Sequence, residues 1–122
     1  MIFVMPSRSA QQEALDRPLS EIKAELFKAL AHPARIRVLE ILVSGERSVG
    51  ELTPLVGIEA SHLSQQLAVL RRARLVTSRK DGARVVYAIR DPALVELLAT
   101  AKRLLISLLA ESEDLLAGLR SR

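Results

Sequence analysis

A short polar segment and a dense cluster of cations lie next to each other in the middle of the chain. The segment carries hydroxyl, imidazole and amide groups at Ser61, His62, Ser64 and Gln65. From Arg71 to Arg90 there are seven arginines or lysines and one carboxylate, a net charge of +6 against +4 for the whole chain. Glutamine and serine can hydrogen-bond base edges, whereas arginine and lysine neutralise phosphates. The combination indicates nucleic-acid binding, although a solvated basic face would have the same local composition.

Other kinds of site have little support in the sequence. The chain has no cysteine, which excludes disulfides and thiolate metal sites. Its two histidines, His32 and His62, have no neighbouring motif for base catalysis, and no glycine-rich phosphate loop is present. We interpret His32, beside Pro33, as a structural helix cap. We therefore expect no enzyme activity, no cofactor and no metal site.

The elements that position the polar segment begin with three predicted helices. The 122 residues suit one domain, and only three of them are aromatic, so Leu, Ala and Val must fill the core. We expect a flexible arm over residues 1–18, and a first helix that starts near Ser20 as its N-cap. Pro33 suits the first position of a second helix, which ends near Val43. A capping box at Ser48–Glu51 predicts a short third helix.

A fourth helix and a hairpin follow. The helix, about residues 60–73, has a leucine stripe at Leu63, Leu67 and Leu70 with the polar segment around it. Two extended segments, 75–80 and 84–89, flank Asp81-Gly82, a strong hairpin-turn signal. The predicted fold is mainly α with a small β-hairpin wing, a winged helix-turn-helix over residues 19–110. The expected DNA-binding residues are Ser61, His62, Ser64, Gln65, Arg72, Arg79, Lys80 and Arg84.

The last predicted helix starts at Pro92 behind an Asp91 N-cap, and residues 111–122 form its end and a tail. Its leucines cover a surface too wide to pack on one small domain, so a second copy of the chain is the expected partner. The expected dimer-interface residues lie on the first and last helices: Ile22, Leu26, Leu97, Leu98, Ala101, Leu105 and Leu108. No segment approaches the roughly 20 apolar residues that span a bilayer, and we expect a cytoplasmic protein.

Three segments of the chain resemble a known family. They are LFKALAHPARIRVLEIL, SVGEL, and SHLSQQLAVLRRARLV followed by DGARVVYAI. Together they are similar to the ArsR/SmtB (arsenical-resistance-repressor) family of winged-helix regulators over residues 26–109. The resemblance implies a homodimer joined through the first and last helices, repression by operator binding, and control by an effector. It carries DNA contacts over to Ser61, His62, Ser64, Gln65 and the segment 79–84.

The chain also departs from the family pattern. The family's metal-binding residues are missing, because Glu51-Leu52-Thr53-Pro54 stands where many members have cysteines and the last helix has no histidine. Gln66 occupies a position that is often histidine, and we expect it to face the helix packing. Arg74 replaces the usual glycine after the fourth helix, so either the helix ends differently or some backbone strain is accepted.

We expect a transcriptional regulator that binds an inverted repeat in double-stranded DNA as a homodimer. The alternative is a winged-helix interaction module whose basic face binds an acidic protein. A small-molecule effector remains open, because no residue pattern identifies one.

Overall fold

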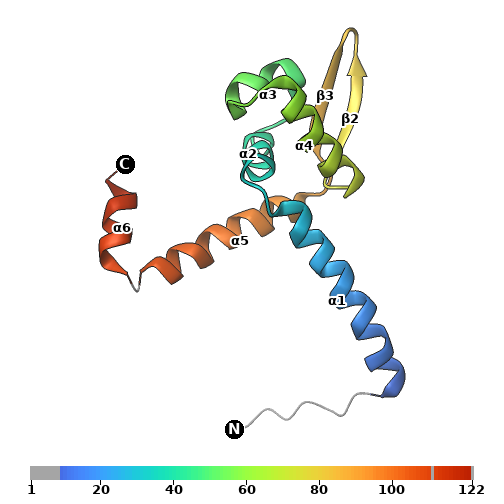
Figure 1. The fold of residues 1–122 in the computed structure, drawn as a ribbon, viewed down its shortest axis with the longest axis vertical. Coiled ribbons are helices and arrows are strands. Elements are labelled where there is room, and N and C mark those ends of the chain that lie inside the picture. Colours follow the sequence, from blue (N-terminus) through green and yellow to red (C-terminus); the bar gives the residue numbers. More distant parts are fainter. Residues whose placement is uncertain (1–8, 111, 122) are drawn as a thin grey trace.

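The computed structural model describes residues 9–110 and 112–121. Figure 1 shows a central body with two long helices that leave it in different directions. The elements in chain order are α1 (Ala10–Leu30), α2 (Pro33–Leu42), β1 (Arg47–Ser48), α3 (Val49–Val56), α4 (Ala60–Arg72), β2 (Val76–Asp81), β3 (Arg84–Ile89), α5 (Pro92–Leu109) and α6 (Glu113–Arg120). This is the predicted winged helix-turn-helix, mainly α with a small antiparallel sheet.

The predicted start of the first helix was wrong. Helix α1 begins at Ala10, and Pro18 lies inside it. Ser20 is therefore not an N-cap; its hydroxyl donates to the carbonyl of Asp16, 2.8 Å away and one turn earlier. Residues 10–17 are rich in Ala, Gln, Glu and Leu, strong helix formers that continue the helix past the proline. The predicted arm is thus helical from Ala10 to Pro18, and its first eight residues lie outside the described part.

The caps of α2, α3 and α5 confirm the sequence predictions. Nδ1 of His32 accepts from the N–H of Ala34 at 3.0 Å, and Oδ1 of Asp91 accepts from the N–H of Ala93 at 2.9 Å. In the capping box, Oγ of Ser48 accepts from the N–H of Glu51, whose carboxylate accepts from the N–H of Ser48. Each side chain satisfies a backbone N–H that has no partner within its helix.

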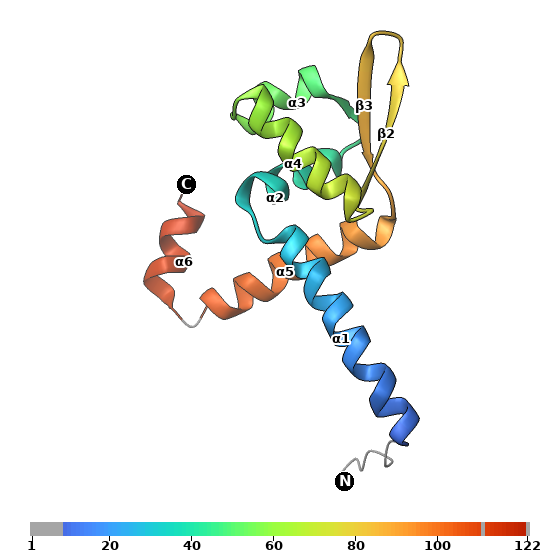
Figure 2. The same ribbon diagram turned by 45° about the vertical axis from the view of Figure 1, so that its right-hand side comes forward.

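The sheet has the strand order β1-β3-β2, all antiparallel, and the two-residue strand β1 was not predicted. Asp81 pairs with Arg84, so the hairpin turn consists of Gly82 and Ala83, one residue later than predicted. Gly82 has φ +63° while Ala83 does not have a positive φ, which matches a type II′ turn with glycine in its first central position. The hairpin extends beyond the body beside α4 (Figures 1 and 2).

The core of the body is aliphatic, as the composition predicts. Leucines at the predicted spacing of α4 (Leu63, Leu67 and Leu70) are at most 1% exposed. They pack with Val38, Leu39 and Leu42 of α2, Leu52 of α3, and Val76 and Leu94 further along the chain. This core fixes α4 and the hairpin relative to each other.

The chain's end differs from the single last helix that was expected. Helix α5 ends at Leu109, and a separate helix, α6, starts at Glu113. Within the described residues, no helix is both long and apolar enough to cross a membrane.

Candidate nucleic-acid interface

Helices α3 and α4 form the helix-turn-helix, and Gly57 makes the turn. Gly57 has φ +79°, a left-handed conformation, and its N–H donates to the carbonyl of Thr53 at 3.0 Å. Helix α4 then buries its leucine stripe and exposes its polar side. Ser61, Ser64 and Gln65 are exposed on that side, as the sequence predicts for side chains that reach bases.

His62 is half-buried, and its ring packs against that of His32. The ring centroids lie 5.8 Å apart at an interplanar angle of 83°, an edge-to-face contact. His32 in turn caps α2 through Nδ1, which confirms its structural role. The start of the recognition-type helix is thus packed against the start of α2.

Ion pairs hold two of the three predicted wing cations. Arg79 lies 2.5 Å from a carboxylate oxygen of Glu46 and 4.0 Å from Asp81. Its pKa is raised above the usual value, first by the hydrogen bond to Glu46 and then by the charge of that carboxylate. Arg84 lies 3.1 Å from Asp81 and 3.9 Å from Glu51. All five side chains are about half exposed, so water screens these pairs and phosphates could replace the carboxylates.

Further cations of the basic region lie in the last turn of α4 (Arg71 and Arg72) and on β2 (Lys80). In the described part of the chain, Arg71, Arg72 and Lys80 make no ion pair. Arg71 and Arg72 line a hollow of about 390 Å³ between α4 and β3, together with Ser64, Ala68 and Tyr87. Arg71 and Tyr87 were absent from the predicted DNA-binding residues. The density of cations in the sequence pointed to Arg71, but only the packing of β3 beside α4 brings in Tyr87.

Arg74 accepts the backbone strain that the sequence suggested. Its φ is +62°, the only positive φ of a non-glycine residue in the described chain. The N–H of Leu75 donates to the carbonyl of Leu70, and the N–H of Arg74 to that of Arg71, both at 3.0 Å. These two bonds form a Schellman motif, which turns the chain from α4 into β2.

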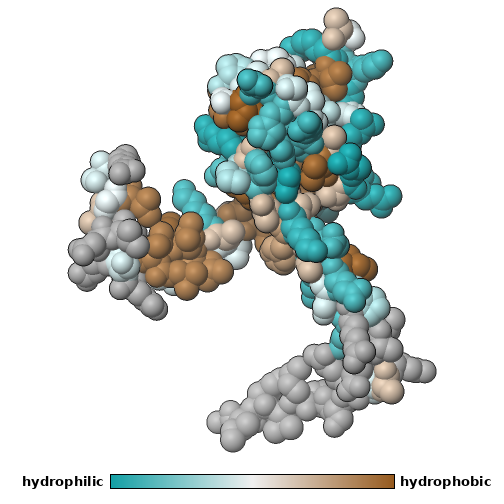
Figure 3. Space-filling model, in the orientation of Figure 1, coloured by the Kyte–Doolittle hydropathy of each residue, from teal (hydrophilic) through white to brown (hydrophobic). Residues whose placement is uncertain are grey.

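The predicted dimer-interface residues fall into two groups. Leu26, Leu97 and Leu98 are partly buried and pack against the core of the same chain. Ile22, Ala101, Leu105 and Leu108 are exposed. Leu104, Leu105 and Leu108 share one side of α5 by their spacing, and Figure 3 shows an apolar surface over this helix. The second group is therefore the one available to a partner.

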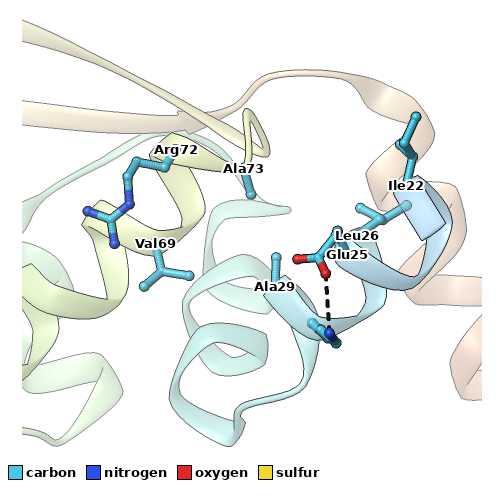
Figure 4. Close-up of a pocket in the computed structure, with 8 residues that line it drawn as sticks. Ile22, Glu25, Leu26, Ala29, Val69, Arg72 and Ala73 are labelled. Atoms are coloured by element: carbon cyan, nitrogen blue, oxygen red, sulfur yellow. Dashed lines mark hydrogen bonds and ion pairs between the residues drawn. The ribbon is translucent and has the colours of Figure 1, made fainter. Parts of the chain in front are cut away.

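A groove of about 520 Å³ lies between α1 and α4, where the predicted dimer helix meets the predicted DNA-binding helix. Figure 4 shows the side chains that line it, which include Ile22, Leu26 and Ala29 on α1, Val69 and Arg72 on α4, and Ala73 just after α4. The same arginine lines the hollow beside β3. A predicted interface helix and the end of the recognition-type helix thus share one surface.

Arg35 is a residue of this region that the sequence analysis missed. Its guanidinium donates to carbonyls of α1 and to the side chain of Gln66 on α4. Gln66 is 7% exposed, which confirms the prediction that it faces the packing between helices. An arginine in the first turn of α2 is unfavourable next to the positive helix end, and this mismatch was the available signal.

Comparison with known proteins agrees with this architecture. Residues 32–78 match the family described as bacterial regulatory protein, arsR family. The HTH-type transcriptional regulator Rv0081 of Mycobacterium tuberculosis is 53% identical over 105 residues, which cover 85% of this chain and 92% of that relative. The chain belongs to the arsR family of bacterial regulatory proteins.

Solved structures of other proteins extend this result. The crystal structure of M. tuberculosis Rv0081 matches this arsR-family chain with a TM-score of 0.73 at 56% identity, covering 77% of this chain and 95% of that one. The crystal structure of the transcriptional repressor BigR of Xylella fastidiosa matches with a TM-score of 0.66 at 35% identity. The match covers 75% of this chain and 93% of that one. The solution structure of Mb0332 from Mycobacterium bovis matches with a TM-score of 0.67 at 29% identity, covering 82% of this chain and 89% of that one. That protein is described as a homodimeric winged helix-turn-helix DNA-binding domain.

Metal ligands do not gather in the described part of this arsR-family chain. Within residues 9–110 and 112–121, no group of three or more His, Asp or Glu side chains is placed to hold a metal ion. Three carboxylates are close in sequence near the chain's end, and Glu111 and the side chains of Glu113 and Asp114 lie outside the described part.

Proposed function

We propose that this arsR-family protein is a transcriptional repressor that binds an inverted repeat in duplex DNA as a homodimer. The observation that carries the proposal is the exposed polar side of α4 beside unpaired cations and a basic hairpin. Ser61, Ser64 and Gln65 would meet base edges in the major groove, and His62 would contact the backbone or a base at the helix start. Repression and dimerisation are carried over from the relatives named above.

Phosphate contacts supply most of the affinity in this proposal. Arg71 and Arg72, with Ser64 and Tyr87, line a hollow of about 390 Å³, a size that admits a phosphate group. Lys80 makes no ion pair in the described chain and contacts phosphate directly. Arg79 and Arg84 first leave their carboxylates, which costs little at half-exposed positions.

Homodimerisation covers the apolar surface that α1 and α5 expose. Leu104, Leu105 and Leu108 are each more than half exposed, as are Ile22 and Phe27 of α1. Large exposed apolar side chains gathered on one side of a helix commonly mark an interaction surface. Two copies related by a two-fold axis would place their recognition helices at half-sites about one helical turn apart, roughly 34–36 Å.

The test is selection of bound sequences from a random duplex pool. The expected result is an enriched palindrome whose affinity falls steeply between about 50 and 200 mM salt. Weak binding to every duplex without enrichment would overturn the proposal and favour the alternative, an interaction module whose basic face binds an acidic protein.

A further inference from the structure

One guanidinium joins three helices at the centre of the molecule. Nε of Arg35 on α2 donates to the carbonyl of Ala29 at 2.7 Å, and Nη2 donates to that of Lys28 at 3.1 Å. Both carbonyls belong to the last turn of α1, and that of Lys28 also accepts from the N–H of Ala31 at 3.1 Å. Nη1 donates to Oε1 of Gln66 on α4 at 2.8 Å. The end of α1 and the middle of α4 are thus held by opposite sides of one planar group.

The local sequence of α2 does not explain an arginine at this position. Arg35 lies in the first turn of α2, beside the positive end of the helix dipole, and that turn has no acidic residue to balance it. The negative end of α1 supplies the favourable partner instead. The position of Arg35 is therefore a feature of how the three helices pack.

Gln66 makes this junction part of the core. It is 7% exposed, and in the described part of the chain it is, with Ser48, one of two buried polar residues. No buried side-chain nitrogen or oxygen in that part lacks a hydrogen-bond partner. Loss of the Arg35 bond would leave the Gln66 carbonyl oxygen buried without a partner, which is costly in a packed interior.

We infer that Arg35 is a positioning residue that fixes the angle between α1 and the recognition helix α4. The inference rests on the proposed function, in which α1, together with α5, joins the two protomers and α4 reads DNA. The angle between these helices then sets the separation of the two recognition helices. Arg35 and Gln66 thereby determine which half-site spacing the dimer accepts, although neither contacts DNA.

Lysine cannot replace Arg35 in this role. Its ammonium is a compact charge on a flexible stem, whereas the guanidinium presents donors in a fixed planar fork. Arg35→Lys therefore keeps the charge and removes the geometry. Arg37→Lys is the matched control, because Arg37 is exposed on the same helix and makes no hydrogen bond or ion pair in the described chain.

The first readout is the distance between α1 and α4 within one protomer. Because the chain has no cysteine, Lys23→Cys and Gln65→Cys place spin labels only on these two helices. The labelled protein is diluted into excess unlabelled protein, so that distances between protomers do not contribute. We expect one narrow distribution of the label–label distance in the protein without further substitution (the parent) and in Arg37→Lys. In Arg35→Lys we expect a broadened distribution. An unchanged narrow distribution in a folded Arg35→Lys protein would overturn the inference.

The second readout is selectivity for half-site spacing. The palindrome selected by the parent is compared with versions in which the half-sites are moved by one base pair in either direction. We expect the preference of the parent to fall at least about fivefold in Arg35→Lys and to persist in Arg37→Lys. An equal loss of affinity at all spacings would indicate a general destabilisation and contradict a positioning role.

Substitutions at Gln66 repeat the test from the other side of the junction. Gln66→Glu keeps an oxygen acceptor for Arg35, whereas Gln66→Leu removes it with similar volume. We expect spacing selectivity to survive in Gln66→Glu and to decline in Gln66→Leu; the reverse order would contradict the inference. If the parent enriches no palindrome, the proposed function fails, while the label distances still decide the geometric role of Arg35.

Discussion

Arg79 on the hairpin and Glu46, 33 residues earlier in the loop before β1, form an ion pair at 2.5 Å. The ion pair involves a cation, Arg79, that the sequence predicts to bind DNA. Because both side chains are about half exposed, the pair adds little to folding stability, and in the proposed function its main effect is to compete with phosphate.

Removal of that competitor should strengthen DNA binding. Glu46→Gln frees Arg79, so we expect affinity for every duplex to rise roughly two- to fivefold, with a steeper salt dependence. Fluorescence anisotropy at two salt concentrations measures both quantities. Glu96→Gln, which removes an exposed carboxylate on α5, is the control. An equal gain in the two variants would mean that only net charge matters.

Base reading and phosphate binding should separate between Gln65 and Arg84. Gln65→Ala removes a base-reading amide, so preference for the selected palindrome over random DNA should fall by about 1–3 kcal/mol. Arg84→Ala should weaken binding to all duplexes alike and reduce the salt slope by about 1. Competition binding with both DNAs measures these losses. Equal losses on both DNAs for Gln65→Ala would contradict its base-reading role.

Glycine should relieve the strain at Arg74. The left-handed conformation at φ +62° costs a residue with a Cβ roughly 1–2 kcal/mol. Arg74→Gly should therefore raise the free energy of unfolding by up to about 1 kcal/mol, since the greater freedom of glycine in the unfolded chain offsets part of the gain. Urea denaturation of the variant and the unsubstituted protein measures this difference in the free energy of unfolding. Arg74→Ala keeps the Cβ and loses the charge, and a gain of the same size there would rule out backbone strain as the cause.

A charge on the exposed face of α5 should separate the protomers. Leu108 is 59% exposed, and Leu108→Glu would bury a carboxylate in the proposed interface. Sedimentation should show monomers, and affinity for the palindrome should fall at least tenfold. Ala99→Glu adds the same charge about two and a half turns earlier, on the opposite side of the helix, and should remain dimeric. A dimeric Leu108→Glu protein would place the interface elsewhere.

The capping box of α3 should make stability depend on pH. The backbone N–H of Ser48, and then its hydroxyl, hold the pKa of Glu51 below its ordinary value of 4.5. A lowered pKa in the folded state stabilises the protein above about pH 4.5 and loses that effect as pH falls through the lowered value. Glu51→Gln keeps an acceptor but cannot ionise, so its stability deficit at pH 7 should shrink as pH falls toward 3. Glu59→Gln, which alters an exposed carboxylate that does not cap α4, should give no such trend.

Sequence patterns were sufficient where local chemistry decides the structure. The caps at His32, Ser48 and Asp91 and the leucine spacing of α4 predicted the order and position of α2 to α5. The start of α1 was wrong because Pro18 outweighed the helix-forming residues before it. The turn moved by one residue because Gly82 takes the first central position of the hairpin.

Contacts between distant residues could not be read from those patterns. Arg35 and Gln66 are 31 residues apart and meet only because α2 and α4 pack together. The same holds for Tyr87 beside Arg71, and for the pairing of Arg79 with Glu46. Composition identified a basic surface, but the fold decides which of its cations are paired.

The most direct test of the regulator proposal is a titration of the selected palindrome against the same DNA with one half-site scrambled. Binding of two protomers per palindrome, with at least a hundredfold weaker binding to the scrambled DNA, is the result expected of a dimer that reads both half-sites. Equal affinity for the two DNAs, or one protomer per duplex, would contradict it.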